Sequence, residues 1–149
     1  MKKSDKFRFA EKCLYGYKKN LACLEILQGD LAVVRAGVDV KAQSYQLMIS
    51  FSGEPSDPVS SRLIKIESIE DRISKLERIT KPITKLISDL NGEEILNGSR
   101  NKDLMQILRL LYFGNNTPEA IMQELNIAKT TYFKRRQELV FTTIDYMGL

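Results

Sequence analysis

Residues 117–136 have the sequence TPEAIMQELNIAKTTYFKRR, in which two helix signals flank a tight turn. Thr117 is a favourable N-cap, because its hydroxyl can accept a hydrogen bond from a first-turn amide. Pro118 suits the first helical position, where its missing N–H would be unpaired anyway. This first helix is expected to end near Leu125, so it is short.

A second helix is expected from about Ala128 to Met147, after a turn at Asn126, a residue type that tolerates left-handed backbone. Two helices joined so closely predict a helix-turn-helix. One face of the second helix must pack against the rest of the domain. The expected inward set is Ile127, Tyr132, Leu139, Val140, Ile144 and Met147, with Arg135 contributing the stem of its side chain.

The start of this second helix is basic, with no acidic residue before Glu138. A helix fits the major groove of DNA, and the N-terminal turns of a recognition helix enter it. Base-edge contacts are therefore expected from Lys129, Thr130, Phe133 and Lys134, phosphate contacts from Arg135 and Arg136, and Thr131 completes the candidate DNA-binding set. The alternative is a solvated basic face in an all-helical interaction domain.

A helix from Arg100 to Phe113 is expected before the motif, with Ser99 as its N-cap and Gly114 at its C′ position. Two Asn-Gly pairs within residues 91–99 are turn signals. We therefore expect a domain boundary there.

A long helix is expected to begin at Pro58, capped by Asp57. Its apolar residues follow a seven-residue register, with one seam of Val59, Ile66, Ile73 and Ile87 and another of Ile69, Leu76, Ile83 and Leu90. Two interpretations fit: the helix packs on its own chain, or it forms a dimer seam. Pro82 lies inside the pattern and predicts a kink or a break near Thr80 to Pro82.

An amphipathic N-terminal helix is expected from about Asp5 to Val34, with Gly29 or Gly37 as its end. Residues 37–57 are interpreted as a linker. The basic cluster Lys2, Lys3, Lys6 and Arg8 has two interpretations, a solvated terminus and a second phosphate-binding arm.

Composition narrows the function classes. The chain has 149 residues, 23 Lys and Arg against 19 Asp and Glu, two Cys and no His. Without His, the commonest general base and the commonest transition-metal ligand are missing, so we expect neither an enzyme nor a metal or cofactor site.

The two Cys are expected to be reduced thiols. The N-terminus lacks a secretory apolar core and no run is long enough for a membrane span, so a cytoplasmic protein is expected.

The stretch Thr117–Phe133, the run Thr131–Arg136 and the helix start Ser56-Asp57-Pro58-Val59 resemble ArpU/RinA-type phage transcriptional regulators. The stretch is also similar to the helix-turn-helix in the fourth region of bacterial sigma factors. The resemblance implies a cytoplasmic DNA-binding protein, encoded by a phage or prophage, that activates late genes.

Together these features predict an all-α chain: an N-terminal helix and a long heptad-patterned helix, followed by a C-terminal helix-turn-helix domain. Residues 1–98 are expected to form a dimerisation region and residues 99–149 a DNA-binding domain. The expected function is sequence-specific transcriptional regulation by a homodimer formed through residues 58–90, with double-stranded DNA as partner. Two alternatives remain, a sigma-like factor held by RNA polymerase and a small-terminase-like assembly protein.

Overall fold

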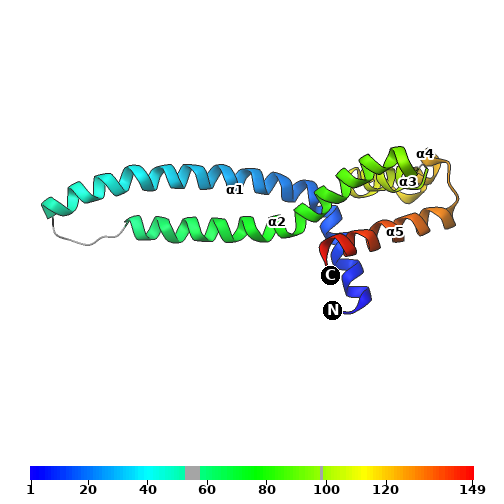
Figure 1. Cartoon of the computed structure of the whole chain (residues 1–149), viewed down its shortest axis with the longest axis horizontal. Helices are drawn as coiled ribbons and strands as arrows, with labels where there is room; N and C mark the ends of the chain where they lie inside the picture. The colour runs from blue at the N-terminus through cyan, green and yellow to red at the C-terminus, as the bar shows by residue number, and fades with distance from the viewer. Residues whose placement is uncertain (53–57, 98) are drawn as a thin grey trace. The chain divides into compact units, whose positions relative to one another are not determined.

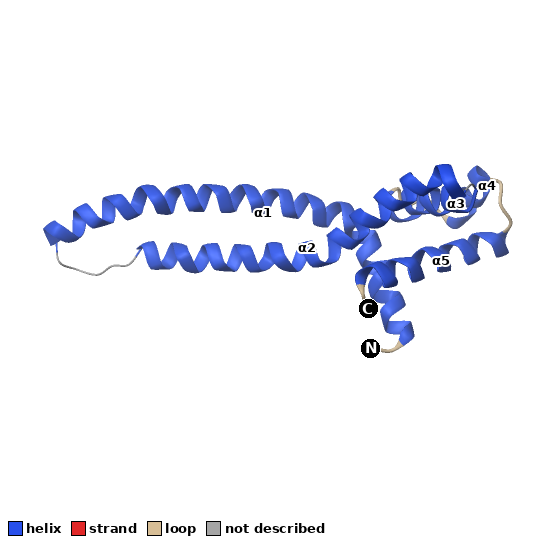
Figure 2. Ribbon diagram, viewed as in Figure 1, coloured by secondary structure: helices blue, strands red, loops and turns tan. Residues whose placement is uncertain are grey.

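The computed structural model describes residues 1–52, 58–97 and 99–149, and every regular element in this part of the chain is a helix. Figures 1 and 2 show these helices. The all-α prediction is confirmed. In chain order the elements are α1 (Lys3–Ser52), α2 (Pro58–Asn97), α3 (Ser99–Ile107), the π-helix η1 (Leu108–Phe113), α4 (Pro118–Leu125) and α5 (Lys129–Met147).

Helix α1 does not end at Gly29 or Gly37, so that prediction is wrong. Residues 37–52 of the expected linker are helical, and residues 53–57, including the expected cap Asp57, lie outside the described residues. A glycine inside a helix costs only about 1 kcal/mol relative to alanine, so tertiary packing of the neighbouring turns can outweigh it.

Helix α2 begins at Pro58, as expected, but it continues through Pro82 and through Asn91-Gly92. Of the kink or break predicted near Thr80 to Pro82, the break is therefore wrong, and so is the turn predicted at Asn91-Gly92. Ile83, Leu86 and Leu90 are all buried in the core beyond the proline, and this burial stabilises the helix against the missing hydrogen bond.

The chain divides into two compact units, which we call the middle unit (residues 21–77) and the terminal unit (residues 1–20 and 78–149). This division differs from the boundary expected between residues 98 and 99. The reason is that apolar residues of 1–20 and 78–90 pack into the same core as the C-terminal helices.

In the middle unit, α1 and α2 lie side by side (Figure 1). Leu24, Leu27 and the seam residue Ile69 are buried, and Arg35 forms an ion pair with Glu70. The seam residues Ile66, Ile73 and Leu76 are half-buried. Seam residues thus pack within their own chain, as the first of the two interpretations expects.

The core of the terminal unit is built by all its helices. Its fully buried side chains include Leu14 of α1, Ile83 of α2, Ile107 of α3, Ile121 of α4 and Leu139 of α5. Burying side chains of this size stabilises a fold by about 2 kcal/mol each. The C-terminal helices therefore depend on the first turns of α1 and the end of α2.

The helix expected over residues 100–113 is present, but its last six residues, Leu108–Phe113, are π-helical. Gly114 follows in right-handed backbone, and Asn115 takes the left-handed conformation instead. A Cβ on Gly114 would lie 2.8 Å from Asn116 Nδ2 and 3.0 Å from the Leu110 carbonyl oxygen. A close approach of neighbouring groups, and not a positive φ, thus accounts for the glycine.

Candidate nucleic-acid interface

The start of α4 is capped as the sequence predicts. Thr117 is extended (φ −70°, ψ 151°) and its hydroxyl accepts a hydrogen bond from the Ala120 amide at 3.2 Å. Pro118 occupies the first helical position. The Ala120 amide is thus hydrogen-bonded, and Pro118 has no amide hydrogen that needs a partner. Both features favour a helix that begins at Pro118.

The turn between α4 and α5 is held by backbone hydrogen bonds. Asn126 adopts the left-handed conformation (φ 52°, ψ 50°), and its amide donates to the Gln123 carbonyl oxygen at 3.3 Å. The amide of Ile127 donates to the Met122 carbonyl oxygen at 3.1 Å. Three residues, 126–128, therefore suffice to redirect the chain from α4 into α5.

The inner face of α5 agrees with the expected set. Tyr132, Leu139 and Val140 are fully buried, Ile144 is buried, and Ile127 and Met147 are partly buried against the core. Thr143 was not among the expected residues, although it is also fully buried. Its hydroxyl donates to the Leu139 carbonyl oxygen at 2.8 Å, which satisfies it within the helix.

The outer face at the start of α5 carries most of the candidate DNA-binding residues. Lys129, Thr130, Phe133 and Lys134 are exposed, while Thr131 is half-buried. Phe133 is 40% exposed. The structure thus brings two cations, a hydroxyl and an aromatic ring onto one accessible surface, which we call the α5 surface.

Arg136 does not belong to the α5 surface, and its expected outward orientation is wrong. Its Nε and Nη2 donate to Oε1 of Glu11 on α1 at 3.0 and 2.6 Å, and its side chain is 28% exposed. Burial works to lower the pKa of Arg136, but the hydrogen bonds with Glu11 and Tyr112 outweigh it and raise that pKa. The guanidinium is therefore charged and already engaged within the terminal unit.

Arg135 is also engaged inside the terminal unit. Its Nη1 donates to Oε2 of Glu138 at 3.2 Å, and its Nε lies 3.8 Å from Oδ2 of Asp103. Arg100 donates to the same Glu138 oxygen at 3.0 Å. Burial works to raise the pKa of Glu138, but these two arginines lower it overall. The partly inward position expected for Arg135 is confirmed, and its charge is neutralised locally.

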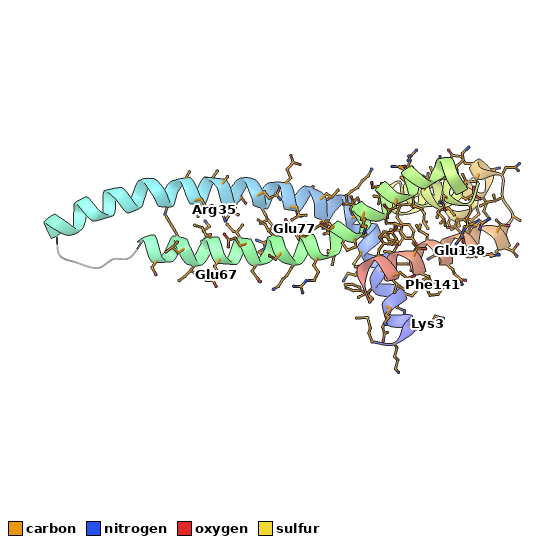
Figure 3. The ribbon with its side chains drawn as sticks, viewed as in Figure 1. Lys3, Arg35, Glu67, Glu77, Glu138 and Phe141 are labelled. Carbon is orange, nitrogen blue, oxygen red and sulfur yellow. The ribbon has the colours of Figure 1, made fainter. Side chains whose placement is uncertain are left out.

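Gln137 is a surface residue that the sequence reasoning missed. It is exposed, and it lies on the outer side of α5 between Lys134 and Phe141. The spacing of three and then four residues could have revealed this stripe. At Phe141 the stripe reaches Lys3 at the start of α1, and Figure 3 shows these two residues close together.

Other kinds of site find little support in the described residues. In residues 1–52, 58–97 and 99–149, no group of three or more Cys, Asp and Glu side chains is arranged to hold a metal ion. Both Cys13, which is buried, and Cys23, which is half-buried, are free thiols. Across the same part of the chain, no helix combines the length and the apolar character that a membrane crossing requires.

Comparison with known proteins gives one match. A family model described as a protein of unknown function (DUF1492) matches residues 61–142, which is more than half of the chain. The matched range includes most of α2, all of α3, η1 and α4, and α5 as far as Thr142. No curated protein and no solved structure matches the chain.

Proposed function

The chain belongs to the DUF1492 family, and we propose that it is a sequence-specific DNA-binding transcriptional regulator that inserts the start of α5 into the major groove. The observation that carries the proposal is the α5 surface, whose Lys129, Thr130, Phe133 and Lys134 are exposed together. A short capped helix and a three-residue turn hold this surface on a buried core.

Charge and side-chain chemistry support DNA as the partner. Lys129 and Lys134 can contact phosphates or guanine edges, Thr130 can hydrogen-bond to bases, and Phe133 can contact a thymine methyl group. Arg135 and Arg136 have no direct role in this proposal, because both guanidinium groups are bound to carboxylates of the same unit.

The biological part of the proposal follows from the resemblance of residues 117–133 to ArpU/RinA-type regulators. We propose a cytoplasmic activator of phage or prophage late genes. We also propose that it acts as a homodimer through residues 58–90, with the contact on a face of α2 other than the seam. The exposed apolar residues Leu63 and Ile64 of the middle unit, 53% and 65% exposed, support a protein contact in that segment.

The proposal is tested by binding of the full chain to DNA fragments from its own genomic neighbourhood at two salt concentrations. We expect one fragment to bind with a dissociation constant on the order of 10 nM or tighter, weakening as salt rises. Lys129→Ala with Lys134→Ala should abolish that binding. Lys18→Ala with Lys85→Ala removes the same charge from two other exposed positions and should retain it.

The mass of the protein in solution completes the test. Equal, weak binding to every fragment, or no binding, would contradict an autonomous regulator. A monomer that requires RNA polymerase for promoter binding would then indicate a sigma-like factor, and a large ring would indicate an assembly protein. A dimer with one tightly bound fragment agrees with the proposal.

A further inference from the structure

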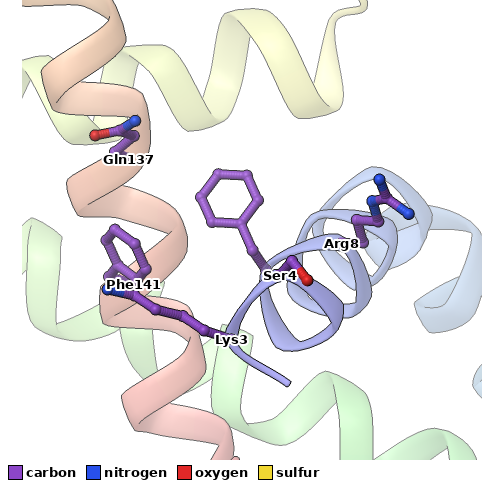
Figure 4. Close-up of a pocket in the computed structure, with 6 residues that line it drawn as sticks. Lys3, Ser4, Arg8, Gln137 and Phe141 are labelled. Atoms are coloured by element: carbon purple, nitrogen blue, oxygen red, sulfur yellow. The ribbon is translucent and has the colours of Figure 1, made fainter. Parts of the chain in front are cut away.

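The first turns of α1 and the second half of α5 enclose an open cleft in the terminal unit (Figure 4). We call it the α1–α5 cleft. Its lining consists of Lys3, Ser4, Phe7, Arg8, Gln137 and Phe141. Two of these six side chains are cationic and none is acidic, so the cleft favours an anionic occupant.

Aromatic rings form the apolar part of the cleft and position one of its cations. The rings of Phe7 and Phe141 meet edge to face with centroids 5.6 Å apart. Lys3 Nζ lies 5.2 Å from the centroid of the Phe141 ring, a cation–π distance. Figure 4 shows the Lys3 side chain reaching from α1 to Phe141. This contact orients the ammonium group without neutralising its charge.

The cations of the cleft differ from the arginines of α5. Arg135 and Arg136 are paired with Glu138 and Glu11. Among the described residues, neither Lys3 nor Arg8 has a carboxylate partner, and both are exposed. Their charges therefore remain available to a ligand.

The cleft lies on the same stripe of α5 as the DNA-binding surface. Lys134, Gln137 and Phe141 follow one another at helical spacing, so the cleft begins where the α5 surface ends. With a rise of 1.5 Å per residue, Phe141 lies roughly 10 Å along the helix from Lys134. The major groove is about 12 Å wide. If the first turns of α5 enter the groove, the cleft meets the sugar-phosphate backbone at its edge.

We propose that the α1–α5 cleft is a second DNA contact, in which Lys3 and Arg8 bind the phosphate backbone that flanks the major-groove site. This inference rests on the proposed function of α5. Under this inference, the α5 surface contacts the bases. The start of α1 contacts the phosphate backbone and so holds α5 in register on the duplex.

The test compares two variants of the full chain that lose the same charge. Lys3→Ala with Arg8→Ala removes the cleft cations. Lys18→Ala with Lys85→Ala is the control, and Lys18 is a close match because its Nζ lies 5.4 Å from the ring centroid of Phe113, outside the cleft. Affinity for the best-bound fragment is measured across a series of salt concentrations, and melting temperatures verify that both variants are folded.

The expected result is a shallower salt dependence for the cleft variant. Each phosphate contact contributes about 0.9 to the slope of log K against log salt, so losing two contacts should reduce it by about 1.8 per bound protomer, or about 3.6 for a homodimer. The control should keep the wild-type slope. A cleft variant whose slope and affinity equal those of the control would overturn the inference.

Two further outcomes separate this inference from the proposed function. If Lys129→Ala with Lys134→Ala abolishes binding and the cleft variant does not differ from its control, only the inference fails. If the wild-type chain binds no fragment, both fail. A cleft variant that keeps its salt slope but no longer recruits RNA polymerase would overturn the inference and assign the cleft to a protein partner.

Discussion

Arg136 of α5 and Glu11 of α1 are joined by two hydrogen bonds to one carboxylate oxygen, at 3.0 and 2.6 Å, although the residues are 125 positions apart. The hydroxyl of Tyr112 on η1 donates to the same oxygen at 2.8 Å. Burial and the bond to Glu11 raise the pKa of Tyr112, so it stays a donor at any physiological pH. One carboxylate thereby fixes the rotation of α5 against two other helices.

Glu11→Gln is expected to destabilise the terminal unit by about 2 kcal/mol, because it leaves the Arg136 guanidinium largely buried without its counter-charge. The effect of Arg136→Met should be smaller in a Glu11→Gln background than in the wild type, by about 1 kcal/mol or more. Urea unfolding of the four proteins measures this coupling. Additive effects would show that the contact contributes nothing specific.

The left-handed backbone at Asn126 should make the turn sensitive to the residue type. Asn126→Ala is expected to cost about 1 kcal/mol, because a Cβ disfavours this conformation, whereas Asn126→Gly should stay within about 0.5 kcal/mol of the wild type. Thermal unfolding of both variants checks the order. If alanine were tolerated as well as glycine, the turn would not depend on this conformation.

Removal of the hydroxyl should have different effects on stability at two buried tyrosines. Tyr132 is fully buried, and among the described residues its hydroxyl has no hydrogen-bond partner, so Tyr132→Phe should leave stability unchanged or raise it by up to about 1 kcal/mol. Tyr112→Phe loses the bond to Glu11 and should cost about 1 kcal/mol. Chemical unfolding of the pair supplies the comparison. A marked loss for Tyr132→Phe would mean that its hydroxyl is satisfied in solution.

Stability should fall in acid as Glu138 is protonated. The pKa of Glu138 is lower in the folded chain than its ordinary value of 4.5, so its contribution is present above that value and is lost as the pH falls through the folded pKa. With Arg100 more than half exposed, the contribution is modest, about 1 kcal/mol. The difference in unfolding free energy between wild type and Glu138→Gln should shrink from neutral pH towards pH ~3. A constant difference would contradict this.

The helix-turn-helix could be predicted from the sequence because local groups determine it. The cap at Thr117, the proline at position 118 and the left-handed Asn126 act within a few residues of themselves. The inward face of α5 followed from helical spacing for the same reason. Both predictions needed no knowledge of distant contacts.

The wrong predictions occur where packing between residues far apart in the sequence outweighs a local signal. Gly29, Pro82 and Asn91-Gly92 suggest helix ends, yet α1 and α2 continue through them because apolar faces on both sides are buried. Arg136 was expected on the outer face because nothing near it in sequence indicates that Glu11 would pair with it. The π-helical turn of η1 likewise has no periodic signature of its own.

The composition of the terminal unit from residues 1–20 and 78–149 has a consequence for synthesis. Glu11 leaves the ribosome 125 residues before its partner Arg136, which at 5–20 residues per second is a delay on the order of 10 s. Until α2 beyond residue 77 is made, the apolar side chains of residues 1–20 have no native partner, whereas the middle unit can already close. The nascent chain therefore completes the α5 surface last, and a chaperone that shields residues 1–20 until then should raise the yield of folded protein.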